Sequence, residues 1–214
     1  IEVAEIALWD KELTIPQISN LGLFAPTPLP ESTSVWKFDN PSEIFKATKG
    51  TDLTPAFCAG SKVITYPETG NANIVSTTGP TASNKAISIP KGSCVKMIHG
   101  IAANGGGCKV NEFSLMIDFK VPLTDNFYPL LQSNLQNSDD GDFFIRKDGS
   151  VGLTGPGYSP AGSIKANTWS RLVIVVEANN PWRLYLDGSL LYTGSSNVAV
   201  DSRYTLDVLG SLLF

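Results

Sequence analysis

Short apolar segments of strand length alternate with turn residues from residue 34 onward, and this pattern constrains the fold more than any other feature. Each segment is rich in Val, Ile, Leu, Phe or Tyr and is bounded by Gly, Pro, Asn or Asp, which is typical of strands. Asp148–Gly149 and Asp187–Gly188 stand between apolar flanks and predict hairpin turns. No amphipathic helix of ordinary length follows Gly22. Many short strands with regular turns predict an all-β sandwich or barrel.

The composition is that of a globular chain with a sizeable core. Its 214 residues suit one large domain, or one domain plus a fragment of another. Hydrophobic residues make up 42% and charged residues 17%, which argues against disorder. A net charge of −4 without a basic cluster argues against a nucleic-acid partner. No apolar run approaches the roughly 20 residues of a membrane helix, so we expect no direct membrane insertion.

The first residues predict a strand followed by a short helix. Residues 2–9 alternate in polarity with a period of two, as a half-buried strand does. Thr14 is a candidate N-cap, Pro16 suits the first turn of a helix, and Gly22 is a candidate stop. The Pro-rich residues 25–34 follow as an extended linker.

Four segments together resemble the laminin-G-like, concanavalin A-like jelly roll, in the bacterial branch of that superfamily. "VWKFD" is similar to an opening strand, "NTWSRLVIVVE" to a Trp-led central strand, "WRLYLDGSLLYTG" to the following hairpin, and "EIALWDKELT" to the closing strand with its helix. The resemblance implies an all-β, two-sheet antiparallel jelly-roll sandwich over residues 35–214.

The resemblance also makes the start of the chain unusual. In the family, a segment like "EIALWDKELT" belongs after one like "YTLDVLGSLLF", which here ends the chain. We expect residues 1–24 to be the displaced closing strand and helix of the same sandwich. Two alternatives are the end of a preceding repeat and strand exchange with a neighbouring chain. The expected arrangement places residues 2–9 antiparallel beside residues 35–39, with Phe214 near Ile1.

The core is expected to consist of alternate apolar positions on the predicted strands. The predicted core residues are Ala4, Ile6, Leu8, Trp36, Phe38, Leu115, Ile117, Phe119, Trp169, Leu172, Ile174, Val176, Leu184 and Leu186.

The chain has three cysteines, and two of them bracket a Gly-rich loop. Cys94 and Cys108 are a candidate disulfide if the protein is exported. The alternative is three buried thiols.

Aromatic and acidic side chains at loops or strand starts are candidate ligand-binding residues, and each aromatic residue has rim packing as its alternative. The candidates are Tyr128, Tyr158, Trp182, Asp140 and Asp142.

Calcium is the one cofactor the sequence raises, because superfamily members hold a hard cation with carboxylates and carbonyls at loop ends. Asp39 and Asp139 are the candidate ligands. Ordinary Asx turns are the alternative.

Catalytic residues are harder to find. A retaining glycoside hydrolase needs two carboxylates about 5–5.5 Å apart. Glu2 and Glu5 are three residues apart on opposite strand faces, and Asp118 stands alone in its segment. His99 lies in a loop, and no Gly-x-Ser-x-Gly motif accompanies it. We therefore expect no enzymatic activity.

The resemblance then implies a non-catalytic recognition module of an exported bacterial protein, at the cell surface or in the periplasm. We expect it to bind a glycan or a partner surface protein and to adjoin other domains of a longer chain. A glycoside hydrolase on this fold and a purely structural spacer domain are the alternatives. Fold alone does not decide among these.

Overall fold

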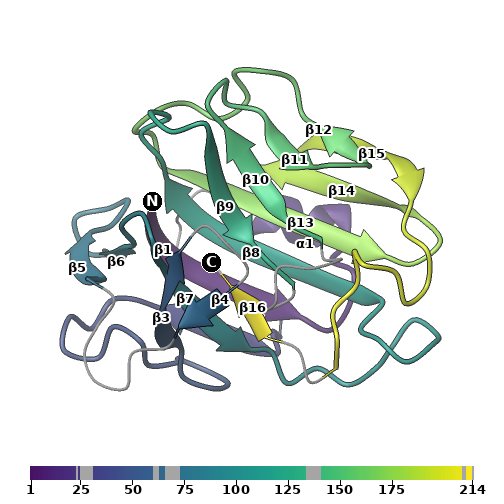
Figure 1. The fold of residues 1–214 in the computed structure, drawn as a ribbon, viewed down its shortest axis with the longest axis horizontal. Helices are drawn as coiled ribbons and strands as arrows, with labels where there is room; N and C mark the ends of the chain where they lie inside the picture. The colour runs from purple at the N-terminus through teal and green to yellow at the C-terminus, as the bar shows by residue number, and fades with distance from the viewer. Residues whose placement is uncertain are drawn as a thin grey trace.

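The computed structural model describes residues 1–22, 24, 31–59, 63–65, 73–133, 141–208 and 211–213. Strands dominate, and they form two layers that lie face to face (Figure 1). All of the strand pairings are antiparallel, so the predicted all-β, two-sheet sandwich is confirmed. Among the described residues, no helix is long and apolar enough to span a membrane.

One layer is an eight-stranded sheet in the order β15-β14-β13-β8-β1-β6-β5, with β2 also paired to β1. Its strands are β1 (Glu2–Trp9), β2 (Ser34–Lys37), β5 (Val75–Thr78), β6 (Lys85–Ser88), β8 (Glu112–Lys120), β13 (Ser170–Glu177), β14 (Pro181–Leu186) and β15 (Ser189–Asn197).

The other layer, which faces the viewer in Figure 1, consists of two four-stranded sheets. One contains β9 (Phe127–Leu131), β10 (Phe143–Arg146), β11 (Val151–Leu153) and β12 (Gly157–Tyr158) in the order β12-β11-β10-β9. The other contains β3 (Thr54–Ala59), β4 (Val63–Thr65), β7 (Ser93–Ile98) and β16 (Ser211–Leu213) in the order β16-β7-β3-β4.

The first strand of the chain lies inside the large sheet. β1 pairs with β8 on one side and with β2 and β6 on the other. Ile6 is the register partner of Trp36, so the predicted antiparallel pairing of residues 2–9 with the "VWKFD" strand is confirmed. The expected proximity of Phe214 to Ile1 lies outside the described residues.

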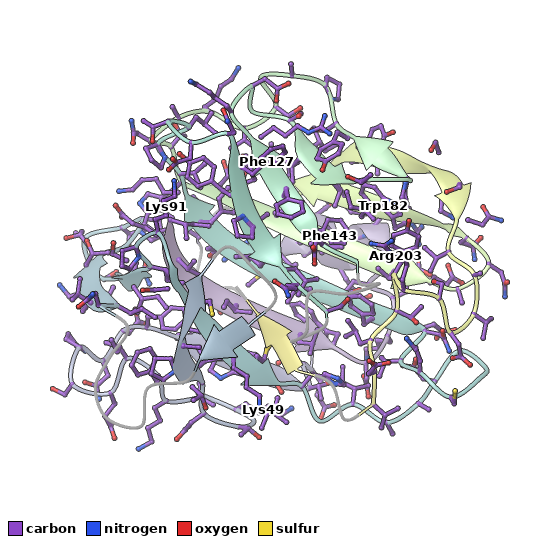
Figure 2. All side chains as sticks on the ribbon, viewed as in Figure 1. Lys49, Lys91, Phe127, Phe143, Trp182 and Arg203 are labelled. Carbon is purple, nitrogen blue, oxygen red and sulfur yellow. The ribbon has the colours of Figure 1, made fainter. Side chains whose placement is uncertain are left out.

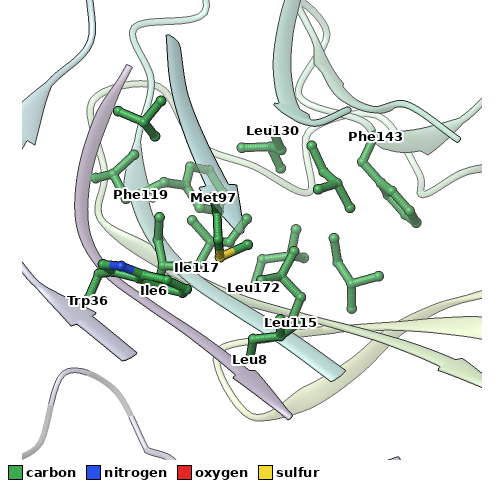
Figure 3. Packing of buried hydrophobic residues seen from close by; sticks show 14 of the residues in the cluster. Ile6, Leu8, Trp36, Met97, Leu115, Ile117, Phe119, Leu130, Phe143 and Leu172 are labelled. Carbon is green, nitrogen blue, oxygen red and sulfur yellow. The ribbon is translucent and has the colours of Figure 1, made fainter. Parts of the chain in front are cut away.

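The core between the layers holds most of the predicted residues, because alternate strand positions face it. Figure 3 shows Trp36, Ile6 and Leu172 of the large sheet together with Met97, Leu130 and Phe143 of the other layer. Trp169 and Leu186 are the exceptions, since both are half-buried. Trp169 precedes β13 instead of lying within it, and Lys120 Nζ lies 5.2 Å from its ring centroid.

Helix α1 (Ile15–Asn20) covers the outer face of the large sheet. Thr14 is the N-cap, as predicted, and its hydroxyl accepts a hydrogen bond from Gln17 N as part of a capping box. Ile18 of the helix packs with Trp9, Met116 and Tyr185. The outer face therefore has a second, smaller core of its own.

Both predicted Asp-Gly turns form hairpins. Asp187 and Gly188 have φ values of 51° and 84°, and Leu186 pairs directly with Ser189. Positive φ at both central residues defines the two-residue turn that suits the twist of paired strands. Gly149, at φ 78°, lies in the turn that joins β10 to β11. This second hairpin carries the side chains described next.

Candidate functional site

The outer face of the β9–β12 sheet carries aromatic side chains on neighbouring strands. On β10, Phe143 and Ile145 are buried toward the core, so Phe144 and Arg146 point outward and are half-buried. Phe127 of β9 is 56% exposed, and its ring meets that of Phe144 edge to face at 5.8 Å. Figure 2 labels Phe127 on the side of the molecule that faces the viewer.

A glycine lets Arg146 reach an aromatic ring two strands away. Gly152 of β11 lies between Phe144 and Tyr158 in one cross-strand row. Because Gly152 has no side chain, the Arg146 side chain can cross β11, and its guanidinium lies 3.3 Å from the centroid of the Tyr158 ring. A Cβ atom at Gly152 would lie 2.2 Å from Gly157 O, so no other residue fits there without a shift of backbone. We call Phe127, Phe144, Arg146 and Tyr158 the aromatic face.

A small pocket of about 70 Å³ adjoins the aromatic face. It is lined by Asp142, Phe144, Leu153, Thr154, Arg203 and Tyr204. The Arg203 guanidinium lies 5.5 Å from the Tyr204 ring, and Tyr204 Oη donates to Thr154 O at 3.4 Å. On this measure a water molecule needs only about 10–15 Å³, so the pocket has room for several polar groups, and Asp142, Thr154 and Arg203 can bind hydroxyl groups there.

Two of the predicted ligand-binding residues, Tyr158 and Asp142, thus lie on this side of the molecule, one on the aromatic face and one in the pocket. Phe127, Phe144, Arg146 and Arg203 were not predicted. The alternation of β10 and the Asp-Gly turn after it could have located Phe144 and Arg146 on the outer face.

Tyr128 and Trp182 are not accessible platforms, and these two predictions are wrong. Tyr128 is 7% exposed, and its Oη accepts hydrogen bonds from Thr124 N at 2.7 Å and Asp125 N at 2.9 Å. Trp182 is 1% exposed and packs edge to face on Phe143 at 5.3 Å. β14 begins at Pro181, just before the predicted strand "WRLYLDG", and Trp182 occupies an inward-facing position in it.

The calcium hypothesis remains a prediction. Asp39 Oδ1 accepts a hydrogen bond from Lys85 N at 3.0 Å, which is compatible with the alternative of a structural Asp. Asp139 and Asp140 lie outside the described residues. In the part of the chain that the structure describes, no three His, Cys, Asp or Glu side chains gather as metal ligands would.

The predicted disulfide between Cys94 and Cys108 is wrong. Cys94 is disulfide-bonded, but Cys108 is a free, exposed thiol. The Cys108 thiol instead donates a hydrogen bond to the Asp201 carboxylate, with 3.2 Å between Sγ and Oδ2. The same carboxylate accepts a hydrogen bond from Lys109 N at 2.8 Å. The hydrogen bond from the thiol to the carboxylate, with the charge of Asp201, raises the pKa of the thiol. The Gly-rich loop is thus fastened to the segment around Asp201.

A second polar cluster lies on the outer face of the large sheet. Glu5 of β1 and Asp118 of β8 are register partners. Arg171 of β13 binds Asp118 through two hydrogen bonds of 2.7 and 2.6 Å, and its Nη2 lies 3.6 Å from Glu5 Oε2. Arg171 Nη1 also donates to the carbonyls of Leu21 and Gly22, just beyond α1. The sequence did not predict this pairing of carboxylates, because the two lie on different strands.

The cluster is built as an anchor for the segment after α1. The Asp118 side chain is 3% exposed, and both of its oxygens are engaged by Arg171. Because Asp118 is buried and held by the Arg171 guanidinium, its oxygens are not open to a substrate. The aromatic face, which is open to solvent, is therefore the better candidate for a site.

Comparison with known proteins gives one structural neighbour of interest. No model of a known protein family matches the chain, and no curated protein matches it. Among solved structures, the chain is similar to domain 4 of AbnA, a GH43 extracellular arabinanase from Geobacillus stearothermophilus, solved in complex with arabinotriose. The TM-score is 0.47 at 12% identity, over 100% of this chain and 84% of that one. We therefore argue function from this chain's own residues.

Proposed function

We propose that this protein is a non-catalytic recognition module that binds a glycan through the aromatic face. The gathering of Phe127, Phe144 and Tyr158 on one outer sheet face carries the proposal. The C–H faces of sugar rings pack on aromatic rings, and neighbouring polar groups then fix their hydroxyls. Thr154 and Arg203 supply such polar groups in the adjoining pocket.

The size of the face favours a glycan over a protein. Phe127 is its one largely exposed apolar side chain among the described residues, since Phe144 and Tyr158 are half-buried. A stable protein interface buries about 800 Å² per partner around a dry apolar core. A few half-exposed rings at strand spacing suit a chain of sugar units instead.

We also propose that the protein is exported and that it is a laminin-G-like domain of a longer bacterial surface protein. The disulfide at Cys94 supports export, because disulfides persist mainly in oxidising compartments. The four motif segments support the family assignment, and the pairing of "EIALWDKELT" with "VWKFD" agrees with the order of that family.

Binding of soluble polysaccharides, measured by calorimetry on the intact chain, tests the glycan proposal. The panel includes arabinan, xylan, mixed-linkage glucan, polygalacturonate and alginate. Phe144→Ala and Tyr158→Ala should each weaken binding by about tenfold, as loss of an anchor ring does. Leu190→Ala is the matched control, since Leu190 is 56% exposed on β15, in the other layer. Absence of binding throughout the panel, or binding that both variants leave unchanged, overturns the proposal.

Reducing-end release on the same panel tests the non-catalytic part. We expect none. Turnover that disappears in Asp142→Asn would instead assign a hydrolase to the pocket beside the aromatic face.

A further inference from the structure

Arg146 is a cation held in place without a counter-ion among the described residues. Its guanidinium is stacked on Tyr158, and its Nε is buried without a hydrogen-bond partner. The arginine ion pairs found among the described residues belong to Arg171 and Arg183. Within the part of the chain that the structure describes, Arg146 thus presents an unpaired charge on the aromatic face.

Asp148 is a described carboxylate that feels the charge of Arg146, and it already has other partners. Asp148 Oδ1 accepts hydrogen bonds from Ser150 N at 2.9 Å and from Ser150 Oγ at 2.7 Å. These bonds lower the pKa of Asp148, and the charge of Arg146 adds less to that effect. Asp148 lies in the β10–β11 turn, and its hydrogen bonds to Ser150 stabilise that turn. It therefore does not neutralise Arg146 by direct contact.

We propose that the aromatic face selects glycans that carry carboxylates, that is, uronic acid residues, and that Arg146 binds the carboxylate. The inference rests on the proposed glycan binding and names its ligand class. A planar guanidinium takes a carboxylate through two parallel hydrogen bonds. The Tyr158 ring beneath Arg146 fixes the plane of the fork and shields one side from water.

The cross-strand row of Phe144, Gly152 and Tyr158 leaves room for one uronic acid unit. Phe144 and Tyr158 are two strands apart, about 9.6 Å, and Gly152 puts no side chain between them. A sugar ring packed on Phe144 lies beside the Arg146 side chain where it crosses β11, and it can direct its carboxylate to the guanidinium stacked on Tyr158. A neutral sugar in the same place leaves that charge unpaired.

The test compares each uronic acid polymer with its own carboxyl-reduced form, which keeps the linkages and replaces the carboxylate by a hydroxymethyl group. Oligosaccharides of polygalacturonate, alginate, hyaluronan and glucuronoxylan serve as probes. We expect at least one acidic form to bind about tenfold more tightly than its reduced form, the effect of a charge-assisted hydrogen-bond pair. The difference should shrink as NaCl is raised, since salt screens exposed charges.

Three variants locate the effect. Arg146→Gln should abolish the preference for the acidic form, and Arg146→Lys should keep only part of it because the planar fork is lost. Lys147→Gln removes the same charge from the next, exposed residue and should leave the preference intact. Unchanged thermal unfolding of each variant shows that the fold is preserved.

Two outcomes separate the inference from the proposed function. Equal affinity for every acidic and reduced pair, or a preference that survives Arg146→Gln, overturns the role of Arg146 while Phe144-dependent glycan binding stands. Absence of binding to all acidic and neutral glycans overturns both.

Discussion

Glu5 and Asp118 face each other across the β1–β8 ladder, and the single guanidinium of Arg171 serves both. Asp118 holds that guanidinium in a bidentate pair, whereas Glu5 is its more distant partner at 3.6 Å. Burial, and then the charge of Asp118, raise the pKa of Glu5. Burial raises the pKa of Asp118 as well, but the two hydrogen bonds from Arg171 offset part of that effect, whereas Glu5 has no such bidentate pair.

Replacing Glu5 by Gln should stabilise the protein at neutral pH. A carboxyl whose pKa is raised on folding favours the folded state while it is protonated, and that contribution is lost as pH rises above its ordinary value of 4.5. Glu5→Gln should therefore raise the midpoint of thermal unfolding at pH 7. The gain should disappear below pH 4.5, where the carboxyl is protonated in both states.

Glu2→Gln is the matched control, because it removes the same charge from the same strand. Glu2 forms a partly exposed ion pair with Lys120 at 2.8 Å, worth at most about 1 kcal/mol. We expect this variant to be neutral or slightly destabilised at pH 7. A loss of stability in Glu5→Gln as large as that in Glu2→Gln would contradict the assignment.

How much of the cluster and the aromatic face could be predicted depends on which contacts are local in sequence. Polarity alternation located β1 and could have located the outward positions of β10, because the alternation of side chains along a strand can be read from consecutive residues. The pairing of Glu5 with Asp118 depends on the register of two strands that are far apart in the chain. The contact of Arg146 with Tyr158 depends further on the absence of a side chain at Gly152 between them.

The wrong predictions have similar causes. Trp182 follows Asn-Asn-Pro, which indicates a loop, yet the strand begins at that proline and the indole turns inward. Tyr128 was placed correctly near a strand start, but its hydroxyl is used to hold the preceding turn. The Cys94–Cys108 pairing was predicted from the spacing of the two cysteines alone. That spacing carries no information about the hydrogen bond between the Cys108 thiol and Asp201, which lies far away in the sequence.

His99 should make the protein less stable as pH falls from 7 to 5. It is the chain's one histidine, it is 1% exposed, and burial lowers its pKa despite the hydrogen bond to Asp207 O. In the neutral ring, Nε2–H donates to Asp207 O at 2.8 Å and Nδ1 accepts from Ile101 N at 3.1 Å. Since the unfolded chain binds the proton more readily below pH 6.5, stability falls there.

Urea unfolding at a series of pH values measures this effect. The free energy of unfolding should decrease between pH 7 and pH 5 in the natural protein and change less in His99→Gln. Parallel profiles for the two proteins would show that His99 does not titrate differently on folding.

The Cys108 thiol should react slowly with disulfide reagents at pH 8 although it is exposed, because Asp201 disfavours the thiolate. Asp201→Asn should speed the reaction several-fold. Asp207→Asn is the control, since Asp207 pairs with Lys109 Nζ at 3.0 Å in the same region and has no contact with the thiol among the described residues. Equal rates for the natural protein and Asp201→Asn would contradict the role of Asp201. Peptide mapping without reductant should find Cys94 protected from alkylation.

Ile6 tests the place of β1 in the sandwich. The first strand contributes a buried face to the main core, where Ile6 is 0% exposed beside Trp36 and Ile117. Ile6→Ala should lower the free energy of unfolding by about 2–5 kcal/mol, through lost burial and the cavity left behind.

Ile15→Ala makes the same chemical change nine residues later, at a side chain that is 61% exposed, and should cost less than about 0.5 kcal/mol. Deleting residues 1–9 should abolish cooperative unfolding, because β8 and β2 would each lose the strand between them and leave unpaired backbone in the sheet centre. A truncated chain that still unfolds cooperatively, or an Ile6→Ala variant as stable as Ile15→Ala, would show that β1 is not part of this sandwich in solution. In that case residues 1–24 would belong to a preceding repeat or to a neighbouring chain.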